Sequence, residues 1–187
     1  MAFLSRIPTL KGIVDKPKPT HMRIITLLLL LLSIFSQAIA QNDTTAMKKL
    51  EFLTGDWKGT GWYKMQESGD SLTFSQKGEW INSGKVLHVS ASFQLYASGD
   101  LTETVVDVTY DEKQKKYLVT AQAGTQEKSN GEGLLVDDHT FQYTLTFGTG
   151  WKMRYSFSVT GSQQIVRGES SNANDSWMQI FGGTINK

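Results

Sequence analysis

Between residues 55 and 185 the chain repeats one pattern, in which apolar and polar residues alternate over short runs that end in compact turns. The clearest run covers residues 151–160, where the alternate positions are Trp151, Met153, Tyr155, Phe157 and Val159. Alternation of this kind is typical of a β-strand with one buried face. The residues between them are lysine, arginine, serine and threonine, which suit the solvent side. The pattern therefore predicts an all-β domain.

The turns divide this part of the chain into about ten expected strands, with no second helical pattern between them. The expected strands cover residues 57–64, 71–81, 85–96, 101–110, 116–123, 132–136, 140–147, 151–160, 163–170 and 176–185, with a polar loop at 124–131. Consecutive short hairpins favour a single antiparallel up-and-down meander. Closure into a β-barrel would protect its edge strands. A two-sheet sandwich is the alternative.

A short helix is expected before the first strand, over residues 46–53. Ala46, Leu50 and Leu53 share one helical face, which can lie on a core. Gly55 suits the left-handed residue that ends a helix.

The beginning of the chain has the pattern of a secretory signal peptide over residues 22–40. Arg23 precedes six consecutive leucines at residues 27–32, and Ala38-Ile39-Ala40 follows. The apolar run is about 12 residues, against about 20 for a membrane span, which is the alternative interpretation. We expect cleavage near Ala40, export to the periplasm or medium, and no stable membrane anchor afterwards. Residues 1–21 are then a leader extension or a misassigned start, and residues 41–187 form the domain.

The expected mature chain is mildly acidic. Five of the 19 Lys/Arg and one of the 18 Asp/Glu lie in residues 1–40, which leaves 14 basic and 17 acidic residues, a net charge of −3. This charge argues against nucleic acid as a partner. The sequence contains no cysteine, so stability must come from a packed core rather than disulfides. The oligomeric state is left open.

The motif Gly55-Asp56-Trp57 after a helical turn, followed by a meander, resembles the lipocalin-like (calycin) β-barrels. Residues 52–61 more specifically resemble a family of exported bacterial domains of unknown function and, more distantly, the nitrobindin-like haem barrels. The resemblance implies that the helix plugs one end of the barrel and that Trp57 packs against it. We therefore assign Gly55 and Trp57 to closing this end, and we expect Arg154 or Arg167 to stack on Trp57. Nitrobindin-like barrels hold haem through a histidine near the C-terminal end. Residues 165–187 contain no histidine, so we expect no haem and no other cofactor.

Candidate catalytic groups are few. His88 is expected on the outer face of its strand, where a carboxylate beside it would give a small hydrolase or isomerase its base. His139 follows two aspartates, but adjacent residues in a turn seldom converge on one metal ion. Glu103 and Asp107 share a strand face at roughly 13 Å, which is wide for paired carboxylates. We therefore predict no catalytic residue and no metal, and lean against an enzyme.

Aromatic residues on the inward phase give the better functional signal. Core packing explains them, and so does a ligand cavity in the barrel. The candidate ligand-binding residues are Tyr63, Phe74, Phe93, Tyr143, Met153, Tyr155 and Phe157. The leading hypothesis is an exported module that binds a small apolar or amphipathic molecule. An interaction domain that uses an outer face, with Trp62 as its anchor, is the second hypothesis.

Overall fold

The computed structural model describes residues 45–64, 69–148, 150–171 and 176–187, all within one compact unit, Ala40–Lys187. Ten strands form the fold. They are β1 (Gly55–Tyr63), β2 (Asp70–Ile81), β3 (Val86–Leu95), β4 (Leu101–Asp111), β5 (Lys116–Ala123), β6 (Ser129–Asp137), β7 (Thr140–Thr146), β8 (Lys152–Thr160), β9 (Gln163–Ser171) and β10 (Trp177–Asn186). The expected signal peptide at 22–40 and the extension at 1–21 lie outside the described residues.

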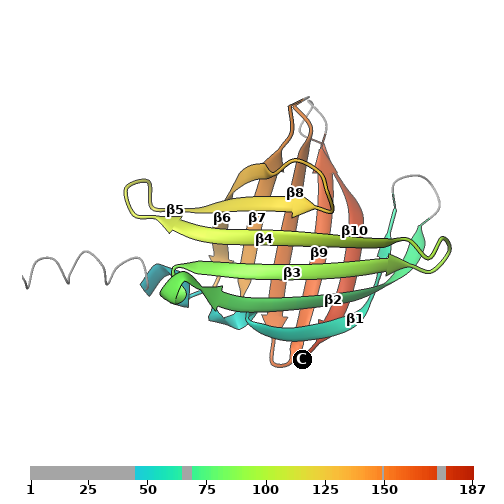
Figure 1. The fold of residues 1–187 in the computed structure, drawn as a ribbon, viewed down its shortest axis with the longest axis horizontal. Coiled ribbons are helices and arrows are strands. Elements are labelled where there is room, and N and C mark those ends of the chain that lie inside the picture. Colours follow the sequence, from blue (N-terminus) through green and yellow to red (C-terminus); the bar gives the residue numbers. More distant parts are fainter. Residues whose placement is uncertain (1–44, 65–68, 149, 172–175) are drawn as a thin grey trace, which may run out of the picture. The chain divides into compact units, whose positions relative to one another are not determined.

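The strands form one closed antiparallel barrel, in which each strand pairs with its neighbours in the chain and β1 pairs with β10 (Figure 1). The all-β, up-and-down barrel is confirmed, and the sandwich alternative is wrong. Closure gives every strand two partners, which removes the exposed edges that an open meander would keep. Strands β1, β3, β5, β7 and β9 end at one end of the barrel, here called the hairpin end.

The opposite end, here called the helix end, carries the residues that precede β1. Residues 45–48 form one helical turn, and the 3-10 helix η1 (Glu51–Leu53) follows. The buried side chains are Met47, Leu50 and Leu53, spaced three apart, which matches the three-residue turn of a 3-10 helix. We expected one helix over residues 46–53 with the 3.6-residue period of an α-helix, which would bury Ala46. That expectation was wrong, because the buried residues follow a three-residue period and include Met47 instead. The Tyr117 hydroxyl donates to the Ala46 carbonyl at 2.8 Å and ties this segment to β5.

The hydrophobic core fills the helix end of the barrel. Trp57, Leu87 and Ile185 are fully buried there together with Leu50. Gly78 lets the pre-strand segment lie directly on β2, because a Cβ at this position would be 2.3 Å from the carbonyl oxygen of Leu53. The absence of one side chain in β2 thus sets how closely the segment packs on the barrel.

Strand β6 is longer than the sequence predicted. It begins at Ser129, within the expected polar loop, and it contains Gly131 and Gly133. Glycines weaken the sequence signal for a strand. Here they allow close approach, because a Cβ on Gly131 would be 2.0 Å from the Thr144 carbonyl oxygen, and one on Gly133 would be 2.5 Å from the Phe141 ring.

Within the part of the chain that the structure describes, no helix has both the length and the apolar character that a membrane crossing requires.

Candidate ligand-binding site

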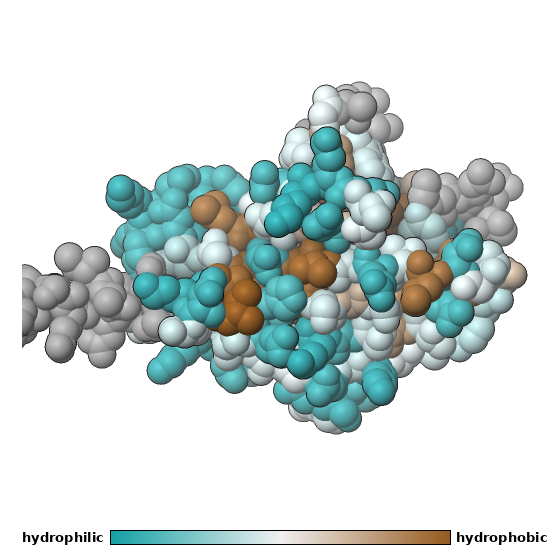
Figure 2. Space-filling view, in the orientation of Figure 1, coloured by the Kyte–Doolittle hydropathy of each residue, from teal (hydrophilic) through white to brown (hydrophobic). Residues whose placement is uncertain are grey.

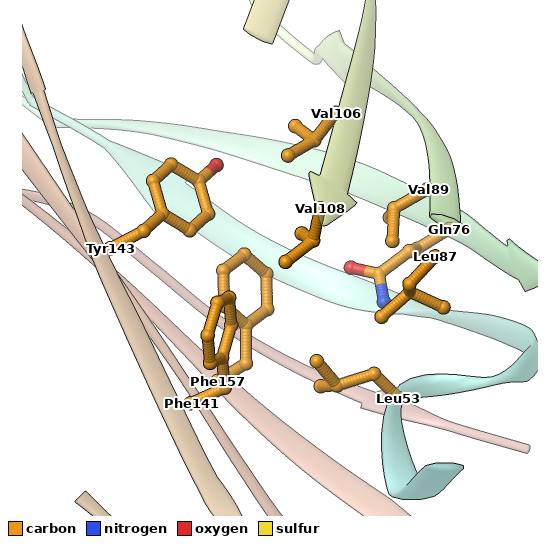
Figure 3. Close-up of a pocket in the computed structure, with 9 residues that line it drawn as sticks. All are labelled: Leu53, Gln76, Leu87, Val89, Val106, Val108, Phe141, Tyr143 and Phe157. Atoms are coloured by element: carbon orange, nitrogen blue, oxygen red, sulfur yellow. The ribbon is translucent and has the colours of Figure 1, made fainter. Parts of the chain in front are cut away.

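A small cavity lies inside the barrel between the Leu53 side chain and the middle of the strands (Figure 3). Its volume is about 20 Å³, which is room for about one water molecule or one atom of similar size. The lining residues are Leu53, Gln76, Leu87, Val89, Val106, Val108, Phe141, Tyr143 and Phe157. Gln76 and Tyr143 are the lining residues that carry polar groups, and the wall is otherwise apolar.

The side chains that face the cavity come from opposite walls of the barrel. Figure 3 shows the carboxamide of Gln76 pointing from β2 into the cavity, across from the rings of Phe141 and Phe157. Gln76 is only 4% exposed, and its Nε2 donates to Oε1 of Gln164 on β9 at 3.4 Å. The two glutamines therefore bridge the barrel through its interior.

The seven candidate ligand-binding residues form two groups. Tyr143 and Phe157 line the cavity with stacked rings 5.8 Å apart, and Tyr155 lies 5.3 Å from Tyr143. Met153 joins this group, since its sulfur accepts the Tyr155 hydroxyl at 3.7 Å.

Phe74 and Phe93 form the second group through a residue that the sequence analysis did not single out. The ring of Phe181 on β10 contacts Phe74 edge-on at 5.7 Å and Phe93 at 6.3 Å. Tyr63 packs against the core at the hairpin end of β1. No residue of this second group lines the cavity, so ligand contact for all seven remains a prediction.

Exposure of the inward side chains differs between the two ends of the barrel. Most inward side chains at the helix end are buried, apart from Trp80, Tyr110 and Leu135, whereas inward side chains nearer the hairpin end of β3–β5 and β8 keep part of their surface in solvent. These half-buried inward residues include Ala91, Phe93, Val106, Ala121, Met153, Tyr155 and Phe157. Because Val106 and Phe157 also line the cavity, the cavity borders the solvent-accessible part of the interior.

The interior around the cavity is electrically neutral. In the described strands the inward positions carry no Lys or Arg, and the acidic residue among them is Asp70, which begins β2 at the hairpin end. Burial raises the pKa of Tyr155 to about 12 and that of Tyr143 well above its ordinary value, and in each case a neighbouring tyrosine adds to the rise. Burial also raises the pKa of Tyr63. These phenols stay protonated at neutral pH and can act as hydrogen-bond donors.

Gln76 is the main site residue that sequence reasoning missed. It has the same phase in its strand as Leu72 and Phe74, so the alternation alone places it inside the barrel. A polar residue at an apolar position was the available signal. Gln164, on the inward phase of β9 with Val166, carries the same signal.

Gly55 and Trp57 lie at the helix end, where Trp57 is completely buried. The stacking partner of Trp57 is Lys187, whose Nζ is 4.7 Å from the ring centre, so the expectation of Arg154 or Arg167 was wrong. Arg154 instead lies over Trp177 on the outer wall, 4.2 Å from its ring centre. The reason is strand phase, because both arginines alternate with inward residues and point outward.

The two described histidines lie outside the barrel interior. His88 is on the outer wall, where its Nδ1 is 2.7 Å from Oδ1 of Asp107. His139 is exposed in the turn before β7, and Asp137 there accepts the backbone N–H of His139. Neither ring reaches the cavity, so the interior offers no histidine to a haem iron. No group of three or more potential metal ligands occurs among the described residues.

A larger hollow of about 360 Å³ lies on the outer wall over β1–β4. Small residues form its floor, where the hydroxyls of Ser75 and Ser92 are 2.8 Å apart. Both signs of charge surround it, from Lys58 and Lys77 to Asp56 and Glu103. The hollow is shallow and carries no net charge that would select a partner.

Trp62, the expected anchor of an interaction surface, is 38% exposed on the outer wall. Its ring lies over Gly182, and Ser71 is its partner on the other side. Neither neighbour adds apolar surface. On the face over β2–β4, Figure 2 likewise shows small apolar patches with hydrophilic residues between them.

Comparison with known proteins identifies the fold. No family model matches the chain, and no curated protein matches it. Among solved structures, Rv2717c from M. tuberculosis is similar over 76% of this chain and 96% of its own, with 11% identity and a TM-score of 0.56. The S-type phycobiliprotein lyase CPES from Guillardia theta is similar over 74% and 89%, with 7% identity and a TM-score of 0.52.

A redesigned β-barrel, mFAP1, bound to DFHBI, also matches over 74% of this chain and 98% of its own, with 14% identity, but its TM-score is 0.43. The likeness to Rv2717c and CPES, together with the strand order, gives the fold as a lipocalin-like ten-stranded barrel. CPES is a lyase and mFAP1 was solved with DFHBI bound, but at these identities the likeness to this chain concerns the fold alone.

Proposed function

We propose that this protein binds a small, uncharged, mainly apolar molecule inside its barrel. The observation that carries the proposal is the exposure pattern of the interior. Inward apolar side chains on β3–β5 and β8 remain partly in solvent. They border a cavity whose lining includes the polar residues Gln76 and Tyr143. An apolar ligand that covers this exposed apolar surface removes it from water, which favours binding by about 25 cal/mol per Å² of buried surface.

The shape of the interior indicates how a ligand would lie. The cavity of about 20 Å³ holds one group the size of a hydroxyl. The rest of the molecule would lie toward the hairpin end, against Tyr155, Phe157 and Val106. In this proposal the segment with Leu50 and Leu53 plugs the helix end, so the ligand enters from the hairpin end. The expected signal peptide would place the binding module outside the cytoplasm.

The first test is native mass spectrometry of the protein purified from its own host, compared with its denatured mass. A reproducible additional mass of an uncharged organic molecule is the expected result. A haem-sized addition would contradict the predicted absence of haem.

A second test uses the uncharged fluorescent probe N-phenyl-α-naphthylamine. The probe should bind with enhanced emission, and Ala121→Trp should reduce its affinity at least tenfold by filling the half-buried part of the interior. Gln122→Trp, on the outer face of the same strand, is the matched control and should bind as the wild type does. Equal loss in both variants, or no binding by the wild type, would contradict binding inside the barrel.

A further inference from the structure

The Gln76–Gln164 pair leaves polar atoms without partners in the driest part of the barrel. Gln76 Oε1 and Gln164 Nε2 are both buried and have no hydrogen-bond partner among the described residues. The residues themselves are 4% and 0% exposed. A buried polar atom without a partner costs about 1–3 kcal/mol, so such atoms are rare without a further role.

The position of Gln76 points to that role. Its side chain lines the cavity, and among the described residues its side-chain hydrogen bond uses Nε2, so the acceptor Oε1 is left for an occupant. Tyr143 lines the opposite side of the same cavity, and Figure 3 shows that its hydroxyl does not point toward the Gln76 carboxamide. One unpaired acceptor thus faces a space the size of one hydroxyl group.

We propose that Gln76 is the residue that orients the ligand, by accepting a hydrogen bond from a hydroxyl or N–H at the ligand's inner end. This inference rests on the proposed function. The ligand class is an apolar alcohol, phenol or amine-like N–H donor in its uncharged form. A hydroxyl supplies the donor hydrogen that Oε1 of Gln76 lacks within the described structure.

Other polar groups fit this cavity less well. A carboxylate would bring a negative charge into a neutral interior with no cation to pair with it, which is costly. An ether or ester oxygen would face Gln76 Oε1 with an acceptor against an acceptor. The site therefore discriminates by the presence of a donor hydrogen rather than by size.

The test is calorimetric titration of the purified protein with β-naphthol, its methyl ether and β-naphthoate. In the wild type the alcohol should bind about five- to tenfold more tightly than the ether, as expected for one neutral hydrogen bond. The carboxylate should bind most weakly. Gln76→Met keeps the length of the side chain without the acceptor, and it should reduce the alcohol-to-ether ratio to about one. Gln142→Met, on the outer face of β7, should leave the ratio unchanged.

The outcomes separate the two proposals. Binding of alcohol and ether with equal affinity in the wild type would overturn the role of Gln76 and leave the binding function standing. A ratio that survives in Gln76→Met would overturn it as well. Absence of binding by both probes would contradict the proposed function together with this inference. The wild-type ratio needs no variant, so the test holds even where Gln76→Met does not fold.

Discussion

The Nζ of Lys187 lies 4.7 Å from the ring centre of Trp57, so the last residue of the sequence covers a tryptophan at the start of the first strand. Trp57 is fully buried, and its partner strand β10 brings Lys187 to it. A cation over an aromatic face is attracted by the negative charge of the π-system. The contact thus joins the two strands that close the barrel.

Lys187→Ala should lower the free energy of unfolding by about 0.5–1 kcal/mol, because it removes the cation over Trp57. Urea unfolding followed by tryptophan fluorescence measures this change. Lys115→Ala, at an exposed turn residue, is the control. An equal effect of the two substitutions would show that the stacking adds nothing.

Gly78→Ala should destabilise the protein by about 1–3 kcal/mol through overpacking. The new methyl group would meet the Leu53 carbonyl oxygen at 2.3 Å and push the pre-strand segment away from the barrel. Thermal unfolding measures the loss. Gly148→Ala, where a Cβ meets nothing within 4 Å, should change stability by less than about 0.5 kcal/mol. If Gly78→Ala left the thermal stability unchanged, close packing of the pre-strand segment on β2 would not contribute to stability.

Alkaline pH should weaken the fold between about pH 10 and pH 12. Burial raises the pKa of Tyr155 to about 12, so the folded state holds this proton more tightly than the unfolded state, where the ordinary value is 10.0. The stabilisation is complete below pH 10 and is lost as the pH rises through the folded pKa. Urea unfolding at a series of pH values should show a shallower loss in Tyr155→Phe. Identical slopes in the two proteins would refute the assignment.

Replacing both interior glutamines should cost little stability or increase it. Gln164→Leu alone leaves Gln76 without its partner and should destabilise by about 1–3 kcal/mol. The double substitution Gln76→Leu with Gln164→Leu removes both polar groups and should equal or exceed the wild type by up to about 1 kcal/mol. A double-mutant cycle by urea unfolding measures the coupling. Additive losses would contradict a shared buried network.

Arg154 should stabilise the outer wall where β8, β9 and β10 meet. Its Nε is 2.8 Å from Oε2 of Glu169, and its guanidinium covers Trp177. Arg154→Lys keeps the charge but loses the planar group that stacks and pairs together, so about 0.5–1.5 kcal/mol should be lost. Urea unfolding measures the loss, and Arg167→Lys, exposed on the same wall, is the control. An unchanged midpoint for Arg154→Lys would show that the contact is not stabilising.

Much of this architecture follows from sequence alone. Alternation with a period of two is local, because each residue's side of the strand depends only on its parity along the chain. For that reason Tyr63, Phe74 and Tyr143 were placed on the inward phase, and His88 on the outer one, without any coordinates. Closure is also favoured by the sequence over a sandwich, since ten consecutive antiparallel strands have few other ways to protect their edges.

The tertiary structure decided what local patterns cannot contain. Which side chains meet across the barrel depends on strand register and curvature, so the Phe74–Phe181–Phe93 cluster and the Lys187–Trp57 contact required the closed fold. Gly131 suits its strand because the Thr144 carbonyl oxygen approaches its Cα too closely for a side chain, and this approach is visible only in the folded barrel. Above all, the pairing of Gln76 with Gln164, 88 residues apart, exists only after closure. Sequence determines which side a residue faces, whereas the atoms that it meets there depend on the whole barrel.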